Sequence, residues 1–265
     1  MVQVAGAVAI GDLDNDLKPD IITVTSCNTP SSSFNKSYVK VFWNDGFGNF
    51  TKSSYKLELK NAQSVKVLLG DLNNDGFLDP VFVISNLGNI IILANKGKNL
   101  ENNPIFQSTV TINGEAYNPS LLNVSPKKVL LEDLDRDGDL DLLSLSSNGQ
   151  AVSVYANKGD MRLYQGDTNG VGKNYYYLSD NFVDFAVGDI NKDALSDIVL
   201  LGNNEYAKAI LSDDGVFTTS FVVQAPSGAT RIMIGILVAT PGRIWPRFPR
   251  HLSKRLFISM AMLVA

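Results

Sequence analysis

Four short segments of the chain concentrate acidic side chains at alternate positions. Their sequences are GDLDNDLKPD at 11–20, GDLNNDGFLD at 70–79, EDLDRDGDLD at 132–141 and GDINKDALSD at 188–197. Counted from the first Asp, each segment places a carboxylate or an amide at positions 1, 3, 5 and 9. Calcium binds roughly six to eight oxygens in a flexible shell, and the backbone carbonyl of position 7 can add one more. The pattern therefore predicts a metal-binding loop in every segment.

The predicted ligands form four sets, each with four side chains and one backbone carbonyl. They are Asp12, Asp14, Asp16 and Asp20 with the carbonyl of Lys18; Asp71, Asn73, Asp75 and Asp79 with Phe77; Asp133, Asp135, Asp137 and Asp141 with Asp139; and Asp189, Asn191, Asp193 and Asp197 with Leu195. None of these ligands is His or Cys, which excludes zinc and copper, and magnesium demands a tighter octahedral shell. We expect up to four Ca²⁺ ions, with no catalytic residue and no organic cofactor.

Two other interpretations of the segments were considered. An EF-hand closes its shell with Glu at position 12 between two helices, whereas position 12 here is Thr23, Phe82, Ser144 or Leu200. Asp and Asn also mark ordinary turns, but a turn needs one or two of them and not four at fixed offsets. Clustered carboxylates repel one another without a cation. Calcium loops between strands explain the pattern better.

The four loops differ in their predicted affinity. Position 6 requires a sharp turn that glycine adopts most easily, and Gly76 and Gly138 meet this requirement whereas Leu17 and Ala194 do not. Loop three combines four carboxylates with glycine, so we expect the tightest site there. Loop four has three carboxylates and Ala194, so we expect the weakest site there.

The loops recur at spacings of 59, 62 and 56 residues, which indicates a repeat architecture. Each repeat carries four strand-like runs, for example SVKVLLG, PVFVISN, NIIILANKG and IFQSTV in the second. A glycine-marked turn such as WNDGFG follows the third run, as in a tight hairpin. Four short antiparallel strands in a unit of about 60 residues predict an all-β fold, a β-propeller built from four-stranded blades.

At this point the sequence resembles a known family. The D-x-D-x-D-G-x-x-D loop, the apolar strand after it and the N-D-G-x-G-x-F element from Asn44 to Phe50 are similar to FG-GAP/VCBS repeats. That family includes the seven-bladed propeller of integrin α subunits and many secreted or surface proteins. The resemblance spans about residues 4–224. It implies calcium loops on one rim that rigidify the propeller, while ligands generally bind elsewhere.

The resemblance divides the chain into two regions. Residues 1–224 are expected to hold the repeats, at about 4–60, 61–120, 121–180 and 181–224. Four repeats are fewer than the seven blades of that family, so we expect part of a larger propeller or a truncated product; a closed four-bladed ring is the alternative. Residues 225–265 are a divergent basic, apolar tail, with five Arg, one Lys and no Asp or Glu.

The tail has two interpretations. A basic segment after an acidic one can contact nucleic acid or acidic lipid, or the segment is simply not propeller sequence, as after an altered reading frame. The second is favoured, because the tail has no fifth acidic loop. Its apolar stretches, IMIGILVA and LFISMAMLVA, are shorter than the roughly 20 residues that span a bilayer. We therefore expect membrane attachment only through a missing or tail-borne anchor.

Composition limits the partners and the cellular locations that can be expected for this protein. Of 27 acidic residues, 15 lie in the four loops, so the low isoelectric point reflects the metal sites and does not support nucleic-acid binding. The single Cys27 allows no internal disulfide. The glycosylation sequons at Asn35, Asn49 and Asn123 are weak evidence for secretion, and no signal peptide is visible. An extracellular or cell-surface location is expected from the resemblance and from the calcium supply there.

The leading functional hypothesis is a calcium-stabilised recognition or adhesion module without catalysis, which binds a protein or glycan at its propeller loops. The alternatives are the propeller part of a secreted carbohydrate-active or other hydrolytic enzyme, and a truncated ectodomain of a membrane-anchored surface protein. The only histidine, His251, lies in the tail, which argues against an enzyme. One aromatic set has two interpretations, a binding patch or blade packing, of which packing is favoured: Tyr175, Tyr176, Tyr177, Phe182 and Phe185.

Overall fold

The structure, a computed structural model, describes most of the chain. The described residues are 3–27, 37–55, 65–84, 89–107, 111–112, 115–116, 126–165, 175–177, 181–203, 206–213, 216–238 and 255–262. Asn35, Asn123, His251 and the expected boundaries near 60 and 120 lie outside them. In the described part every regular element is a β-strand, which confirms the all-β prediction. No helix able to cross a membrane occurs among these residues.

Two of the repeats form complete four-stranded antiparallel sheets. The first sheet has the order β1 (Gln3–Gly11), β2 (Asp20–Cys27), β3 (Ser37–Asn44), β4 (Phe50–Tyr55). The fourth has the order β17 (Phe182–Gly188), β18 (Asp197–Gly202), β19 (Tyr206–Asp213), β20 (Val216–Gln224). The predicted antiparallel units of four strands are thus confirmed in both.

The two central repeats are variations on this unit. The second comprises β5 (Val65–Gly70), β6 (Asp79–Ile84) and β7 (Asn89–Ile92), followed by the hairpin of β8 (Ala94–Lys98) and β9 (Pro104–Gln107). The third sheet contains β12 (Pro126–Glu132), β13 (Asp141–Ser146), β14 (Ala151–Ala156) and β15 (Arg162–Gln165). Beyond β15 the sheet continues with β10 (Thr111–Ile112) and β11 (Glu115–Ala116), and β16 (Tyr175–Tyr177) pairs with β14.

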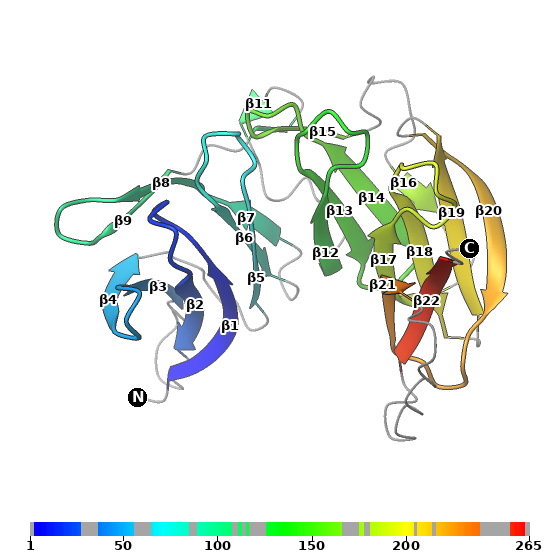
Figure 1. Cartoon of the computed structure of the whole chain (residues 1–265), viewed down its shortest axis with the longest axis horizontal. Helices are drawn as coiled ribbons and strands as arrows, with labels where there is room; N and C mark the ends of the chain where they lie inside the picture. Colours follow the sequence, from blue (N-terminus) through cyan, green and yellow to red (C-terminus); the bar gives the residue numbers. More distant parts are fainter. Residues whose placement is uncertain are drawn as a thin grey trace.

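The units follow one another in an arc, and its two ends do not meet (Figure 1). The first strand of each unit packs against the first strand of the next, so β1, β5, β12 and β17 are the inner strands. After the fourth sheet, β21 (Arg231–Val238) packs on β17 as a fifth inner strand and pairs in parallel with β22 (Arg255–Met262). The described residues do not form a closed seven-bladed ring.

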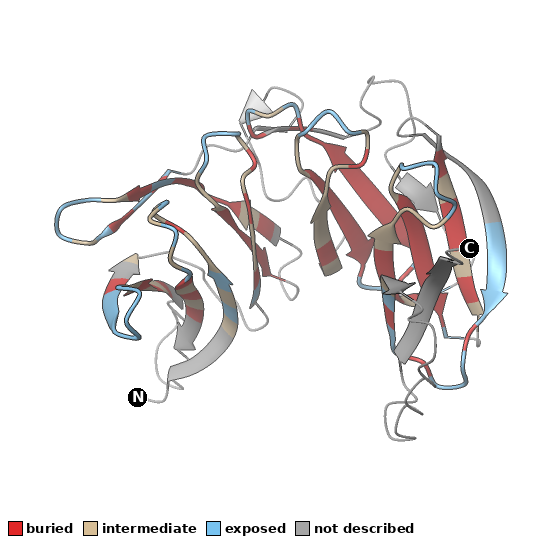
Figure 2. Cartoon of the chain, viewed as in Figure 1, coloured by how far each residue is buried: buried red, intermediate tan, exposed pale blue. Residues whose placement is uncertain are grey.

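Each junction between neighbouring units, here called a seam, is filled by an apolar cluster. We call the face of a unit that meets the preceding unit its front face, and the other its back face. In the first seam, Ala9 and Ile22 on the back of the first sheet meet Val67 and Leu69 on the front of the second unit. The same arrangement recurs in the next three seams. Figure 2 shows the buried residues concentrated on the central strands.

The second strand of a unit is buried on both faces, which explains the continuous apolar run that follows each acidic loop in the sequence. Every residue of β6, β13 and β18 is buried, because neighbouring units cover both faces of these strands. Strands covered on both faces lose the alternation of polar and apolar residues that a half-exposed strand shows. The energy that holds the units together is therefore mainly apolar burial in the seams.

Two expectations about packing can be compared with the structure. Phe182 and Phe185 are fully buried in the third seam, so the packing interpretation holds for these two aromatics. The start of the segment expected to be a divergent tail packs on the fourth sheet, where Ala225, Ala229 and Ile232 are buried. The Ile232 amide donates to Asp184 Oδ2 at 3.0 Å.

Candidate metal-binding loops

All four predicted loops occupy the same place in the fold. Each connects an inner strand to the second strand of its unit: β1 to β2, β5 to β6, β12 to β13, and β17 to β18. The inner strands lie side by side, and each loop follows the end of its inner strand. The loops therefore lie along one rim of the arc (Figure 1). The twenty predicted ligand positions are all described, and the structure gathers them into four groups of five.

The carboxylate at position 1 organises the backbone of its own loop. Asp12 accepts the amides of Asp16 and Leu17 at 3.1 and 2.7 Å. The other loops repeat this contact with the amide of position 6, from Gly76 to Asp71, from Gly138 to Asp133 and from Ala194 to Asp189. Position 1 therefore turns the chain back on itself and brings the other acidic side chains together.

Positions 3 and 5 form a second set of local contacts. The side chain of position 5 accepts the amide of position 7 in every loop, from Lys18, Phe77, Asp139 and Leu195, at 2.8–3.0 Å. The position 3 side chains of Asn73, Asp135 and Asn191 accept the amide of position 5. All four loops thus share one conformation, whether or not they contain glycine.

Position 9 fastens the loop to the rest of its sheet. Asp141 accepts the Leu134 amide with Oδ2 at 2.9 Å and the Asn157 amide with Oδ1 at 2.8 Å. Asp20, Asp79 and Asp197 make the same pair of contacts, and all four side chains are buried. The sequence identified these residues as ligands, but it did not reveal that each one also joins the loop to the end of the third strand.

The backbone turns sharply at two positions of each loop. Position 6 has φ of 88° and 93° at Gly76 and Gly138, and the left-handed conformation persists at Leu17 and Ala194, with φ of 65° and 74°. Position 4 is also left-handed in every loop, at Asn15, Asn74, Arg136 and Lys192. A non-glycine residue in this conformation costs about 1–2 kcal/mol. All four loops therefore hold strain at position 4, which the sequence did not predict, and loops one and four hold further strain at position 6, which it did.

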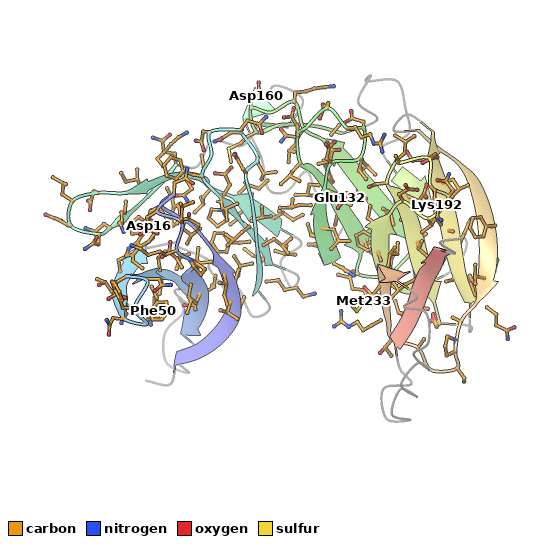
Figure 3. The ribbon with its side chains drawn as sticks, viewed as in Figure 1. Asp16, Phe50, Glu132, Asp160, Lys192 and Met233 are labelled. Carbon is orange, nitrogen blue, oxygen red and sulfur yellow. The ribbon has the colours of Figure 1, made fainter. Side chains whose placement is uncertain are left out.

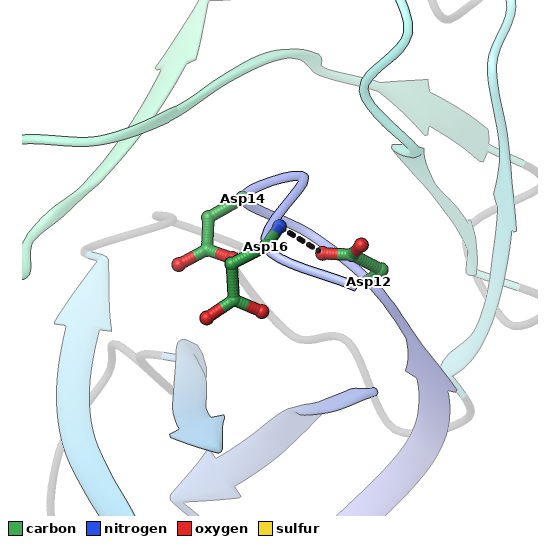
Figure 4. Close-up of side chains that lie close together, drawn as sticks. All are labelled: Asp12, Asp14 and Asp16. Carbon is green, nitrogen blue, oxygen red and sulfur yellow. Dashed lines mark hydrogen bonds between the residues drawn. The ribbon is translucent and has the colours of Figure 1, made fainter. Parts of the chain in front are cut away.

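Carboxylate oxygens converge in two of the loops. In loop one, Asp12, Asp14 and Asp16 each offer an oxygen within 4.8 Å of the others (Figure 4). In loop three, Asp133, Asp135 and Asp141 do the same. Loops two and four carry Asn73 and Asn191 at position 3 and so have one carboxylate fewer.

Two buried oxygens in these clusters lack a partner. Asp14 Oδ1 and Asp133 Oδ1 are buried without a hydrogen-bond donor among the described residues, and the Asp14 side chain is only 5 % exposed. A buried carboxylate oxygen without a partner is costly, and a cation at the centre of each cluster would satisfy it. The donor set therefore fits Ca²⁺ in loops one and three.

Lysine side chains reach into loops one and two. Lys98, from the hairpin of the second unit, forms an ion pair with Asp14 across the first seam, and its ammonium lies 4.9 Å from the centre of the Trp43 ring. Lys96 forms an ion pair with Asp75 in loop two, and Lys18 pairs with Asp16 at 3.0 Å in loop one. These ammonium groups neutralise part of the acidic charge and compete with a divalent cation for it.

The electrostatics of two buried position 9 carboxylates, Asp79 and Asp141, differ from those of an exposed ligand, Asp193. Burial raises the pKa of Asp79 to about 6 and that of Asp141 to about 7, although backbone hydrogen bonds oppose the change. Repulsion from Asp135 and Asp137 also raises the pKa of Asp141. For Asp193, hydrogen bonds from the Leu195 amide and the Asn191 side chain lower the pKa. A bound cation would therefore relieve the repulsion and burial cost at Asp79 and Asp141.

An asparagine at the end of the third strand joins neighbouring loops. Asn95 Nδ2 donates to the Leu13 carbonyl in loop one at 2.7 Å and to the Leu78 carbonyl in its own loop at 3.0 Å. Asn157 connects loop two to loop three in the same way. Sequence reasoning missed this role, although the recurring A-N-K-G motif contained the signal.

A second bridge joins loops two and three directly. The side-chain amide of Asn74, at position 4 of loop two, donates from Nδ2 to Asp139 Oδ1 in loop three. Asp139 was predicted to contribute only its backbone carbonyl to a metal ion, and its side chain thus has a further structural role. Through these contacts, the conformation of one loop depends on that of the next.

Comparison with known proteins agrees with this geometry. The family model for the FG-GAP-like repeat matches residues 12–82 and 133–200, together more than half of the chain. The chain belongs to the FG-GAP-like repeat family. Each matched segment begins at a position 1 aspartate, Asp12 or Asp133, and extends to position 12 of the next loop. No curated protein sequence gave a significant match.

Proposed function

We propose that this FG-GAP repeat protein is a calcium-stabilised recognition or adhesion module of the extracellular space or the cell surface. Its four units act as blades of a β-propeller that needs further blades for closure. The observation that carries the proposal is the pair of buried, unpartnered oxygens, Asp14 Oδ1 and Asp133 Oδ1, inside converging carboxylate clusters. The family membership supports it, because FG-GAP repeats are typical of extracellular proteins.

The metal has a structural role in this proposal. Ca²⁺ would be held by the side chains at positions 1, 3, 5 and 9 with the carbonyl of position 7, and it would supply charge neutralisation. Extracellular calcium modules bind with Kd of about 10⁻⁴–10⁻³ M. At about 1 mM calcium, a site with Kd of about 10⁻⁴ M adds about 1.4 kcal/mol to folding. Several sites together then match a large part of a domain's stability.

We further propose that the protein is not an enzyme. The acidic side chains of the loops accept hydrogen bonds from backbone amides of their own loops, and this leaves them poorly placed for proton transfer to a substrate. A protein or glycan ligand would bind at the connecting loops, since a rigid scaffold with variable loops suits recognition. Neither nucleic acid nor a membrane surface is proposed as a partner.

Thermal unfolding with defined metals tests the calcium part. The full chain would be melted in EDTA, in 1 mM magnesium and in a calcium titration. We expect the melting temperature to rise by several degrees with calcium and hardly with magnesium. The variant Asp133→Ala should lose part of this rise, whereas Glu101→Gln, an exposed acid outside the loops, should retain all of it. A melting temperature that ignores calcium would refute the proposal.

Binding assays test the recognition part. The chain would be applied to a glycan array and to a panel of immobilised extracellular proteins, each with calcium and with EDTA. We expect saturable binding to one class that weakens in EDTA, because removal of calcium loosens the loops. Turnover of a bound glycan, measured as released reducing ends, would contradict the non-catalytic assignment.

A further inference from the structure

Two consecutive residues of loop two are held by the third unit. Asn157 Nδ2 donates to the Leu72 carbonyl at 2.8 Å, and the Met161 amide donates to the same carbonyl at 3.3 Å. Asn73 Nδ2 lies 3.8 Å from Met161 Sδ, within reach of the weak hydrogen bond that a thioether accepts. Positions 2 and 3 of loop two are therefore fixed by groups that belong to the next unit.

Position 4 of loop two contacts loop three itself. Asn74 Nδ2 donates to Asp139 Oδ1. The two side chains lie against the turn between β14 and β15, which is on the rim where Figure 3 labels Asp160. Gly159 in this turn has φ of 73°, and a Cβ atom there would stand 2.7 Å from Asp139 Oδ1 and 2.9 Å from Asn74 Nδ2. A residue without a Cβ is thus required to make room for the bridge.

The groups that hold loop two are themselves tied to the ligand positions of loop three. The carbonyl of Asp139 is the predicted ligand at position 7, and its amide donates to Asp137 Oδ1, at position 5, at 3.0 Å. The Asn157 backbone amide donates to Asp141 Oδ1, at position 9, at 2.8 Å. An ion in loop three would hold all three of these acidic residues. It would therefore order the same groups that order loop two.

The two loops differ in what they offer to a cation. Loop three has three converging carboxylates, and one of them, Asp133, has a buried oxygen without a partner among the described residues. Loop two has Asn73 at position 3, and its Asp75 forms an ion pair with Lys96. Loop three should therefore bind its ion first, and loop two is the loop whose affinity depends more on its surroundings.

We propose that calcium bound in loop three raises the calcium affinity of loop two, through the Asn74–Asp139 bridge and the contacts of Asn157. This coupling rests on the calcium binding proposed above and adds an order of filling to it. A second ion meets a loop that the first ion has already ordered, so it binds more tightly. Two divalent ions on one rim also repel each other, but at exposed loops water and salt screen that repulsion. Coupling between binding sites is reciprocal, so calcium in loop two raises the affinity of loop three by the same factor.

NMR with selective labels would follow each loop separately in the full chain. Carbonyl-13C Asp combined with 15N Gly reveals only the four Asp–Gly pairs of the sequence, among them Asp75–Gly76 in loop two and Asp137–Gly138 in loop three. Both glycine amides donate to the carboxylate at position 1 of their loop, so their signals report its conformation. In a calcium titration of the wild type, we expect the Gly138 signal to change first and the Gly76 signal at higher calcium.

Two variants separate the bridge from the ligands. Asp133→Ala removes a ligand of loop three and leaves every ligand of loop two intact, and we expect the Kd of loop two, followed at Gly76, to rise about fivefold or more. Asn74→Gly removes the bridge alone, because glycine accepts the φ of 55° at this position, and it should also raise that Kd. The matched control is Asn102→Gly, a left-handed asparagine with φ of 59° outside the acidic loops, which should leave both loops unchanged.

The outcomes distinguish the coupling from calcium binding itself. A Gly76 titration that is the same in the wild type, Asp133→Ala and Asn74→Gly, while Gly138 responds in the wild type, would overturn the coupling and leave calcium binding intact. Tighter binding at loop two in Asp133→Ala would also overturn it, because repulsion would then dominate. A wild type in which neither signal responds would refute calcium binding, and the coupling with it. Melting temperatures in EDTA check that each variant folds, and the Asn74→Gly titration decides alone if Asp133→Ala does not.

Discussion

Asn157 Nδ2 lies 2.8 Å from the backbone carbonyl of Leu72 and donates a hydrogen bond to it across the second seam. The same amide reaches the Leu140 carbonyl at 3.1 Å, and the Asn157 backbone amide donates to Asp141. One side chain thus connects two neighbouring acidic loops and the end of the third strand. Together with Asn95, it makes the first three loops parts of one connected rim.

Replacement of Asn157 by Ser should break this connection. Asn157→Ser leaves the carbonyls of Leu72 and Leu140 without a side-chain donor in a buried setting, at a cost of about 1–3 kcal/mol. Urea denaturation would measure the loss. Asn44→Ser serves as the control, because the Asn44 side chain donates within its own unit, to the exposed Pro19 carbonyl, and makes no cross-seam hydrogen bond among the described residues; we expect a smaller loss there. Equal losses for both variants would contradict the role assigned to the cross-seam contact.

The fourth sheet offers the converse test. Ser212 occupies the position of Asn157, and its hydroxyl oxygen is buried without a hydrogen-bond partner among the residues that the structure describes. Ser212→Asn should restore a donor towards loop three and stabilise the chain by up to about 1 kcal/mol. Urea denaturation reports the change, with Ser212→Ala as the comparison that removes the hydroxyl alone. Destabilisation by Asn would show that the third seam has no room for the larger side chain.

Strain at position 6 should be relieved by glycine. Ala194 has φ of 74° and is exposed, so Ala194→Gly removes a left-handed penalty without loss of packing. We expect a gain of about 0.5–1 kcal/mol, since glycine itself raises the entropy of the unfolded chain. Gly138→Ala, at φ of 93° in loop three, should cost a similar amount. Thermal or urea unfolding measures both, and effects of the same sign would refute the explanation.

Removal of the competing ammonium should strengthen the first site. Lys98→Met keeps an unbranched side chain against Trp43 but frees Asp14 from its ion pair. We expect calcium affinity at loop one to rise several-fold at low salt, because a positive charge no longer repels the ion. Isothermal titration calorimetry measures the change, with the exposed Lys52→Met on β4 as control. An unchanged or weaker affinity would mean that Lys98 does not compete with calcium.

The pH dependence of stability should differ with and without calcium. The pKa of Asp79 is about 6 and that of Asp141 about 7, above the ordinary value of 3.8, so the folded chain binds more protons than the unfolded chain between pH 4 and 7. In EDTA, stability therefore falls as the pH rises through this window. Calcium binding requires the deprotonated form, so the stabilisation by calcium grows over the same range.

Melting curves at pH 5.0 and 7.5, each in EDTA and in calcium, would measure both trends. Asp141→Asn should flatten the dependence in EDTA, since the amide has no proton to lose. A melting temperature in EDTA that rises steadily from pH 5.0 to 7.5 would contradict the raised pKa values.

The sequence by itself determined the repeat, the strand class and the four candidate loops. Local information sufficed, because the alternating carboxylates, the position 6 turn and the apolar run after each loop lie within about a dozen residues of one another. Contacts within a loop, such as those from Leu17 and Asp16 to Asp12, follow from that local spacing.

Only the tertiary structure decided how the units meet. The cross-seam contacts of Asn95 and Asn157 join residues 82 and 85 positions apart, and the pairing of Lys98 with Asp14 spans the first seam. No local pattern encodes such distances, since they depend on how each sheet twists and stacks on the next. For the same reason, the exposure of Val8 and the burial of Val67 were indistinguishable in sequence, where both are valines before an acidic loop. What covers each of them is a property of the assembled arc.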